Sequence, residues 1–454
     1  MRGLGALLRN VWRLASPYFN SAEKWSARGL LAVIVALRLS LVGMSVVLSY
    51  WNRAFYNALQ DKDWDSFIAL LFAGKRMPDG YMPGFCAVAA AFVLVAVYRT
   101  YLTQWLTIRW RGWMTTRLQD DWLSNKAYWH ISLSAAADRN GHGTDNPDQR
   151  IAEDVREFIS DTLTLSLGLL SSVVTLFSFV AILWSLSGPL SVMGVSIPGY
   201  MVWVALVYAA VGSALTHWIG KPLAGLRFRQ QRVEADFRFS LARLRENVEG
   251  VALYNGEAEE RRTLGVRFAA VIANWRTIMT RTKLLTFFTA GYDQAAVVFP
   301  LVVASPRYFA GEIGLGGLTQ TAGAFRQVED ALSWFVHSYQ SLATWQATVE
   351  RLTDFQRAIA AAHASGAGIV PVASAAADYA LEDATIALPD GRGLLHKAGL
   401  VLRSGQSVLI AGRSGLGKST LFRTLAGIWP FGRGQVLRPH GRTLFLPQRP
   451  YIPL

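Results

Sequence analysis

Long apolar stretches constrain this chain more than any other feature of its sequence. Five of them cover about residues 29–50, 84–104, 163–187, 198–220 and 286–304. Each approaches or exceeds the roughly 20 apolar residues that a helix needs to cross a bilayer. The composition agrees, because 52% of the 454 residues are hydrophobic and only 17% are charged. The chain is therefore predicted to be a helical membrane protein.

A sixth stretch, about 318–344, is less apolar and contains Arg326, Glu329 and Asp330. Charged side chains within a membrane helix are costly and usually face the bundle interior or a water-filled cavity. We therefore expect this stretch to line an aqueous cavity as the last of six membrane helices.

Arg38 interrupts the first apolar stretch near its middle, so it is expected to face a cavity or a counter-ion. Asp293 in the fifth stretch and Glu329 or Asp330 in the sixth are the candidate partners. Two interpretations stay open for Arg38: a structural ion pair or snorkelling, and a direct role in handling a substrate.

The basic residues indicate how the chain is oriented. The segment between Lys221 and Lys283 is rich in arginine, whereas residues 188–197 and 305–317 hold almost no charge. Positive loops face the cytoplasm, so the long loops and both termini are predicted to be cytoplasmic. We interpret the net charge of +14 as a consequence of this membrane topology. No nucleic-acid partner is expected, since no recognition motif accompanies the basic residues.

The segments outside the bilayer have distinct characters. Residues 1–28 lack a signal-peptide cleavage site and begin with an amphipathic pattern, which predicts an interfacial helix. The long loops 105–162 and 221–285 have helical patterns, so the helices of the membrane domain, 29–357, should run past the bilayer as levers. A small-residue stretch, 358–378, is interpreted as a linker.

From residue 379 to 454 the pattern changes to short strands and predicts the start of an α/β phosphate-binding domain. "YALEDATIAL" alternates, "AGLVL" follows a turn, and "QSVLIAG" runs into a glycine loop. "KSTLFRTLAGIW" then has the spacing of a short helix. Strand, loop and helix form the context that a phosphate-binding loop requires.

The glycine loop matches GxxxxGK[ST] completely. Its glycines allow successive backbone N–H groups to point at phosphate oxygens. Lys418 can reach the β- and γ-phosphates, and the Ser419 hydroxyl can hold Mg²⁺. The predicted ATP-binding residues are Gly412, Arg413, Ser414, Gly415, Leu416, Gly417, Lys418, Ser419 and Thr420.

The loop, with "LAGIWPFGRGQV" and "TLFLPQRPYIPL" after it, resembles the nucleotide-binding domain of ABC transporters. In that family a glutamine about 30 residues after the loop contacts Mg²⁺ and the attacking water, and Gln448 stands there. "GIWP" with "PQRPY" looks like one branch, the peroxisomal fatty-acyl (D subfamily) half-transporters and the bacterial SbmA/BacA-like transporters. "NPDQRIAEDVREF" (146–158) and "ENVEGVALYNGEAEE" (246–260) resemble segments of the same branch.

This resemblance implies a fold and a function. The fold is a type I-like ABC exporter: six transmembrane helices, then an α/β ATPase domain. The function is an ATP-binding permease subunit that works as a homodimer with ATP and Mg²⁺ in the bilayer of a bacterial inner membrane. Its cargo would be a peptide-, cobalamin- or acyl-conjugate-like solute.

The sequence departs from the family pattern in two places. Leu388 occupies the likely position of the aromatic residue that stacks on adenine, so selectivity for adenine is less secure than phosphate binding. No LSGGQ-type signature and no distal Asp-Glu pair follow the loop, so the chain is expected to be C-terminally truncated. Because hydrolysis needs those parts, we expect these 454 residues not to hydrolyse ATP at a transporter's rate.

Two other functions stay open. In the first, the membrane part is a peptide carrier driven by an ion gradient, with a degenerate nucleotide domain; Arg38, Asp293, Glu329 and Asp330 would be its proton-linked residues. In the second, the chain is a membrane-anchored phosphate-binding regulator that transports nothing.

Overall fold

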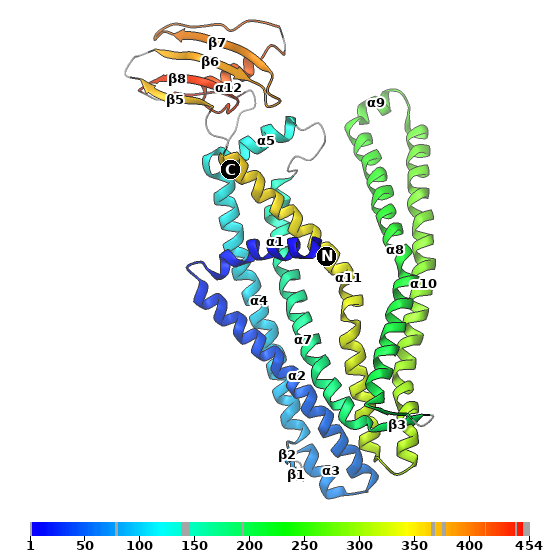
Figure 1. The fold of residues 1–454 in the computed structure, drawn as a ribbon. Coiled ribbons are helices and arrows are strands. Elements are labelled where there is room, and N and C mark those ends of the chain that lie inside the picture. The colour runs from blue at the N-terminus through cyan, green and yellow to red at the C-terminus, as the bar shows by residue number, and fades with distance from the viewer. Residues whose placement is uncertain are drawn as a thin grey trace. The chain divides into compact units, whose positions relative to one another are not determined.

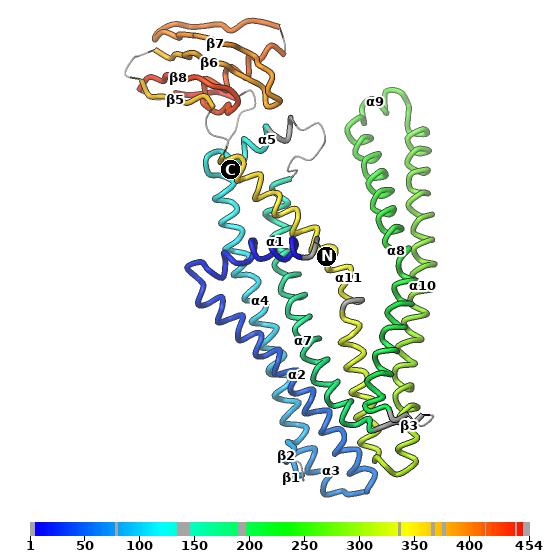
Figure 2. The backbone as a smooth tube through the Cα atoms, in the orientation of Figure 1, coloured from blue at the N-terminus to red at the C-terminus, as the bar shows by residue number. Residues whose placement is uncertain are grey.

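The computed structural model describes residues 2–77, 80–137, 146–192, 195–364, 368–374, 378–413, 415–440 and 443–447. The chain forms two compact units, each assembled from separate segments (Figures 1 and 2). Unit 1 contains Met1–Ala27, Leu106–Asp161 and Thr344–Leu454, and unit 2 contains Arg28–Trp105 and Thr162–Ala343. The predicted boundaries at residues 28, 357 and 378 describe sequence organisation and stay predictions.

Unit 2 consists mainly of long helices or parts of them. These are α2 (Lys24–Gln60), α4 (Phe85–Leu123), α7 (Val155–Ser187), α8 (Tyr200–Glu246), α10 (Glu257–Phe309) and α11 (Leu315–Ala364). Shorter elements connect them: α3 (Trp64–Leu71), α9 (Val248–Leu253), and the hairpins β1–β2 (Lys75–Met77, Gly80–Met82) and β3–β4 (Pro189–Val192, Val195–Pro198).

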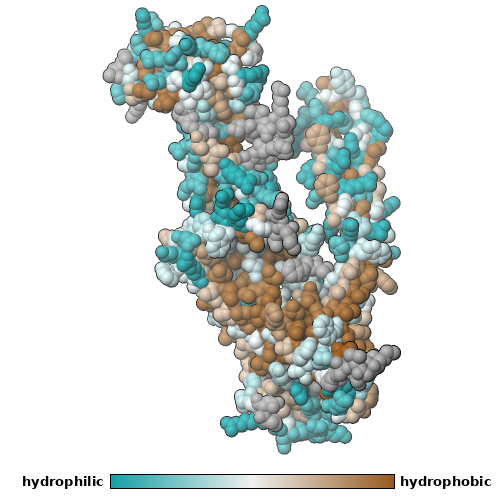
Figure 3. All heavy atoms as spheres, viewed as in Figure 1, coloured by the Kyte–Doolittle hydropathy of each residue, from teal (hydrophilic) through white to brown (hydrophobic). Residues whose placement is uncertain are grey.

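Five helices are long and apolar enough to cross a membrane, among the residues that the structure describes. They are Lys24–Gln60, Phe85–Leu133, Pro147–Ser187, Tyr200–Glu246 and Glu257–Phe309, which contain the five predicted stretches. In Figure 3 hydrophobic residues form a broad band over the helices of unit 2. α11 confirms a helix over the sixth stretch without reaching the apolarity of the other five, so its crossing of the membrane stays a prediction.

The long loop 221–285 is helical, as predicted. α8 continues to Glu246, α9 forms the tip, and α10 returns beside α8, as Figures 1 and 2 show. Two buried amides join the pair in this extension, because Asn274 Nδ2 donates to Gln230 Oε1 at 2.8 Å. The extension is therefore a stiff two-helix arm.

Within the apolar part of the same pair, two tyrosines bond each other's backbone. Tyr208 Oη donates to the carbonyl of Tyr292 at 2.7 Å, and Tyr292 Oη donates to that of Tyr208 at 3.0 Å. Their rings stack 4.4 Å apart. Gly212 makes this approach possible, since a Cβ there would lie 2.3 Å from the Tyr292 ring.

Unit 1 contains the remaining helices and the strands of the C-terminal region. Its further helical elements are α1 (Arg2–Phe19), η1 (Ser124–Lys126), α5 (Ala127–Ala137), α6 (Pro147–Gln149), the π-helical turn η2 (Arg150–Asp154) and α12 (Lys418–Leu425). The strands are β5 (Ile369–Ser374), β6 (Tyr379–Ala387), β7 (Gly393–Leu402) and β8 (Gly432–Pro439), in the order β5-β8-β6-β7. β5 and β8 pair in parallel, whereas β6 pairs antiparallel with both β7 and β8.

The described parts of the predicted linker 358–378 include regular structure. α11 continues through Ala364. This part of the helix is rich in alanine, which has the highest helix propensity of all residue types. Ile369 is buried in β5, which pairs with β8 along its whole length.

The expectation of a strand at "QSVLIAG" was wrong. Residues 406–412 form no strand, and Val408, Leu409 and Ile410 are 51%, 89% and 39% exposed. A strand exists only by pairing, and no described segment pairs with this one. α12 also ends earlier than predicted, because the N–H of Ile428 bonds the carbonyl of Arg423 around Gly427 at φ 63°.

We predict that Gly212→Ala destabilises the α8–α10 pair by about 1–3 kcal/mol, since the new methyl group overlaps the Tyr292 ring. Thermal unfolding in detergent measures the effect. Gly225→Ala in the same helix is the matched control, because a Cβ there meets nothing within 4 Å. It should be neutral or stabilising. An equal loss of stability in both variants would contradict the inference that Gly212 makes room for the Tyr292 ring.

Candidate nucleotide-binding site

The glycine loop is held in a conformation that few residues tolerate. Gly415 and Gly417 have φ angles of 86° and 90°, where a side chain would be strained. Gly417 caps the N-terminus of α12, and a Cβ on it would lie 3.2 Å from the Leu394 side chain. The loop therefore presents the N-terminal N–H groups of α12, a favourable place for an anion.

Lys418 folds over this loop. Its Nζ donates to the carbonyls of Gly412 and Arg413, both at 2.7 Å. Ser419 is exposed at the second position of α12, whereas Thr420 is buried and its carbonyl accepts a bond from Thr424 Oγ1 at 2.9 Å. The Lys418 ammonium group and the Ser419 hydroxyl thus lie together at the junction of the glycine loop and α12.

The donor set fits the phosphates of a nucleotide: backbone N–H groups, one ammonium and one hydroxyl that can serve Mg²⁺. Ser414 and Gln448, the other predicted contacts, lie outside the described residues. Within the described ranges no group of three or more histidine, cysteine or acidic residues could hold a metal. Bound ATP would supply the free energy of phosphoryl transfer, with Mg²⁺ neutralising phosphate charge.

Leu388, the predicted base-contacting position, lies in the turn after β6. Its N–H donates to the carbonyl of Arg392 at 2.8 Å. The side chain packs against the apolar core of the sheet, which includes Leu381, Ile386 and Val436. Any contact with a base would therefore be apolar.

The C-terminal end of α12 is connected to α5, a contact that our sequence analysis missed. Trp129 Nε1 donates to the carbonyl of Ile428 at 2.7 Å, and the Arg423 guanidinium lies 5.5 Å from the Trp129 ring. Leu133 of α5 belongs to the buried core of the sheet. α5 follows α4 through η1, so the loop-bearing helix rests on an extension of a membrane helix.

A buried carboxylate organises the start of α7 in unit 1. Asp154 is 2% exposed and accepts two bonds from Arg351 of α11, at 2.7 and 3.0 Å. Arg150, one turn away in η2, donates a third at 2.8 Å. The bonds to Asp154 raise the pKa of Arg351. The "NPDQRIAED" segment thus supplies the anion that fixes α7 to α11.

The predicted partners of Arg38 were wrong. Arg38 Nε donates to Ser171 Oγ of α7 at 2.5 Å, and the described residues give it no ion pair with Asp293, Glu329 or Asp330. A hydroxyl on a neighbouring helix thus engages one of the five N–H donors of the guanidinium.

The three carboxylates differ in their surroundings. Glu329 is 8% exposed and accepts a bond from Ser333 at 3.1 Å, whereas Asp293 and Asp330 are exposed. Their role in substrate or proton handling stays a prediction.

Comparison with known proteins identifies the family. The family described as "ABC transporter transmembrane region 2" matches residues 14–309, more than half of the chain. The chain belongs to the ABC transporters.

This ABC transporter is 33% identical to the inner membrane ABC transporter ATP-binding protein YddA of Escherichia coli, over 99% of this chain and 77% of YddA. It is 31% identical to the chloroplastic ABC transporter D family member 2 of Arabidopsis thaliana, over 99% of this chain and 66% of that protein. These relatives confirm the predicted branch.

A solved structure supports the fold. A bacterial Atm1-family ABC exporter with ATP bound superposes with a TM-score of 0.59 at 14% identity, covering 90% of this chain and 67% of that one. The ABC transporter therefore has the predicted exporter fold, mostly helical with a small sheet towards its C-terminus.

For the buried carboxylate, we predict that Asp154→Asn lowers the free energy of unfolding by about 3–5 kcal/mol, because it leaves Arg351 and Arg150 without their anion. Chemical unfolding of the detergent-solubilised protein measures it. The neighbouring Glu153→Gln removes an exposed charge and should change stability by less than about 1 kcal/mol. Similar losses of stability in the two variants would show that the net charge, and not the pairing of Asp154 with the two arginines, sets the stability.

Proposed function

We propose that this ABC transporter moves a solute across a bacterial inner membrane by using ATP and Mg²⁺, with its N-terminus and nucleotide domain in the cytoplasm. The observation that carries the proposal is the contact of α12 with α5 through Trp129. Through α12, whose C-terminal end makes this contact, it provides a mechanical connection between the phosphate-binding loop and the extension of a membrane helix. A regulator that transports nothing would have no need of such a connection.

The nucleotide site would work through the loop described above. Backbone N–H groups of Gly415 to Ser419 would surround the phosphates, Lys418 would move from its carbonyl partners to the β- and γ-phosphates, and Ser419 would bind Mg²⁺. Gln448 would complete the Mg²⁺ contact. Differential binding of ATP between two conformations would then drive alternating access.

We predict that Lys418→Ala weakens ATP binding by about tenfold or more, since a charge-assisted contact to phosphate is lost. Equilibrium binding of a fluorescent ATP analogue to the 454-residue chain measures it. Lys397→Ala in β7 is the matched control, because it removes an exposed lysine of unit 1 that lies outside the glycine loop. The proposal fails if both variants bind as the wild type does.

The same substitution separates ATP-driven transport from the gradient-driven alternative. In the protein as its gene encodes it, Lys418→Ala should abolish uptake into proteoliposomes. Uptake that survives Lys418→Ala but is abolished by a protonophore would instead favour an ion-coupled carrier using the buried Glu329.

We predict that Trp129→Phe uncouples transport from ATP binding. The variant keeps an aromatic ring for Arg423 but leaves the carbonyl of Ile428 unpaired, at a cost of about 1–3 kcal/mol. Transport should fall severalfold while the Kd for ATP stays unchanged. Tyr128→Phe, which alters the exposed neighbour, should affect neither. Parallel loss of ATP binding would indicate misfolding of the sheet.

The transporter is further proposed to act as a homodimer. At the α9 tip of the two-helix arm, Val248, Leu253 and Tyr254 are 60%, 74% and 88% exposed. Apolar side chains exposed together mark a contact surface, and a second copy would supply the second ATP site. Light scattering in detergent should give twice the mass of one chain. A monomer that transports would contradict this state.

The substrate is proposed to be a peptide-, cobalamin- or acyl-conjugate-like solute. This choice rests on the membership of the D-subfamily and SbmA/BacA-like branch. Competition of these three classes for ATP-dependent uptake would test it, and competition by none of them would refute it.

A further inference from the structure

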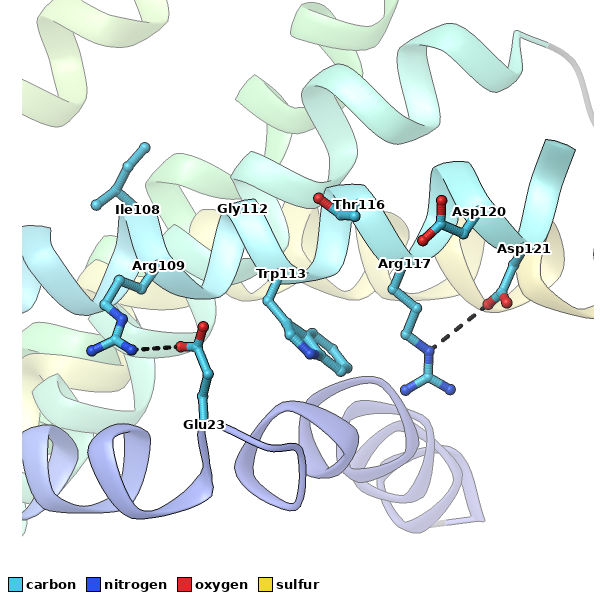
Figure 4. Close-up of a pocket in the computed structure, with 9 residues that line it drawn as sticks. All are labelled: Glu23, Ile108, Arg109, Gly112, Trp113, Thr116, Arg117, Asp120 and Asp121. Carbon is cyan, nitrogen blue, oxygen red and sulfur yellow. Dashed lines mark hydrogen bonds and ion pairs between the residues drawn. The ribbon is translucent and has the colours of Figure 1, made fainter. Parts of the chain in front are cut away.

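A cavity of about 600 Å³ lies in unit 1 beside the turn between α1 and α2. Figure 4 shows its lining. Arg109, Trp113, Arg117 and Asp121 are four residues apart on α4 and share one helix face, and Glu23 approaches them from the turn. This cavity is separate from the glycine loop and has no part in the proposed ATP chemistry.

Two arginines and three carboxylates, Glu23, Asp120 and Asp121, line the cavity, and the two arginines differ in their partners. Arg109 donates to Glu23 at 2.7 Å and to Ser26 at 2.5 Å. Arg117 lies 3.8 Å from Asp121, beyond hydrogen-bond reach, and 5.3 Å from the Trp113 ring. In the described part of the chain no hydrogen bond engages Arg117, so its planar donors are available to an oxyanion.

Aromatic side chains make a rigid wall behind the cavity. Tyr18 of α1 and Trp110 of α4 are 0% and 1% exposed, and their rings stack 5.7 Å apart. The Tyr18 ring also lies 5.6 Å from Trp113. Tyr18 Oη and Trp110 Nε1 are buried without a hydrogen-bond partner among the described residues. Movement of the wall would cost this packing, so the cavity is preformed.

The sequence places the cavity at the predicted edge of the bilayer. Glu23 precedes the first apolar stretch and Arg109 follows the second, each within about 9 Å along its helix. On the two helices that the Glu23 turn joins, Leu8 and Trp12 of α1 and Trp25 of α2 are 56%, 72% and 77% exposed. Exposed apolar residues on an amphipathic helix are typical of one lying at the membrane surface. Phospholipid headgroups occupy this depth.

We propose that this cavity binds the headgroup of a phospholipid that carries both a phosphate and a protonated amine, as phosphatidylethanolamine does. The phosphate would contact Arg117, and the ammonium group would donate to Asp121 and Glu23. The two arginines can hold a phosphate, and the three carboxylates Glu23, Asp120 and Asp121 can accept hydrogen bonds from a protonated amine. A purely anionic headgroup would face the carboxylates unpaired, and a quaternary amine has no N–H to donate to them.

The test measures lipid binding to the delipidated 454-residue chain in detergent by native mass spectrometry. Phosphatidylethanolamine, phosphatidylcholine and phosphatidylglycerol with identical acyl chains are titrated separately. We expect one molecule of phosphatidylethanolamine to bind about tenfold more tightly than either other lipid. Arg117→Ala should remove this preference, because the 48% exposed side chain contributes contacts to lipid rather than to packing.

Arg13→Ala is the matched control, since it removes an exposed arginine of α1 that does not line the cavity. It should leave the preference unchanged. The proposal is overturned if Arg13→Ala and Arg117→Ala weaken binding equally, if the three lipids bind alike, or if Arg117→Ala keeps the wild-type preference. Displacement of the lipid by equimolar soluble O-phosphoethanolamine would also overturn it, because the ligand would then be a free aminophosphate.

Discussion

The scarcity of water inside a bilayer is the constraint on which this structure depends. Backbone groups there must bond within their own segment, so each apolar stretch becomes a continuous helix. A helix that has begun in the membrane has no reason to stop at its surface, and α8 and α10 continue for 47 and 53 residues in all. The arm formed by α8 and α10 is thus an extension of the elements that the bilayer enforces.

Polar contacts between helices then decide how these rods are held. Tyr208 and Tyr292 join α8 to α10, and Asp154 joins α7 to α11. Each of these contacts involves few side chains but forms more than one hydrogen bond. The helices are therefore fixed to each other at particular points along their length. Between such points apolar packing can slide, which suits a protein that must change conformation.

The sequence revealed the elements better than their contacts. Apolar length, helical periodicity and the glycine motif are local signals, so the five spans, the helical loops and the phosphate-binding loop could be predicted. Asp154 with Arg351 and Trp129 with Ile428 join residues far apart, and one sequence does not say which pairs meet. Arg38 shows the same limit, because its partner was a hydroxyl and charge alone pointed elsewhere.

Local pattern also failed where structure needs a neighbour. "QSVLIAG" has the composition of a buried strand, yet a strand forms only beside another one. The alanine-rich stretch after residue 358 looked like a linker, although alanine is the strongest helix former.

The assembly of unit 1 from three distant segments has a consequence for biosynthesis. Trp129 and Ile428 are 299 positions apart, so a ribosome adding about 5–20 residues per second needs about 15–60 seconds between them. During that interval α5 has left the ribosome while Leu133 still lacks the sheet residues that bury it. The nascent chain must therefore keep this helix soluble, near the membrane surface or on a chaperone, until its C-terminal partners arrive.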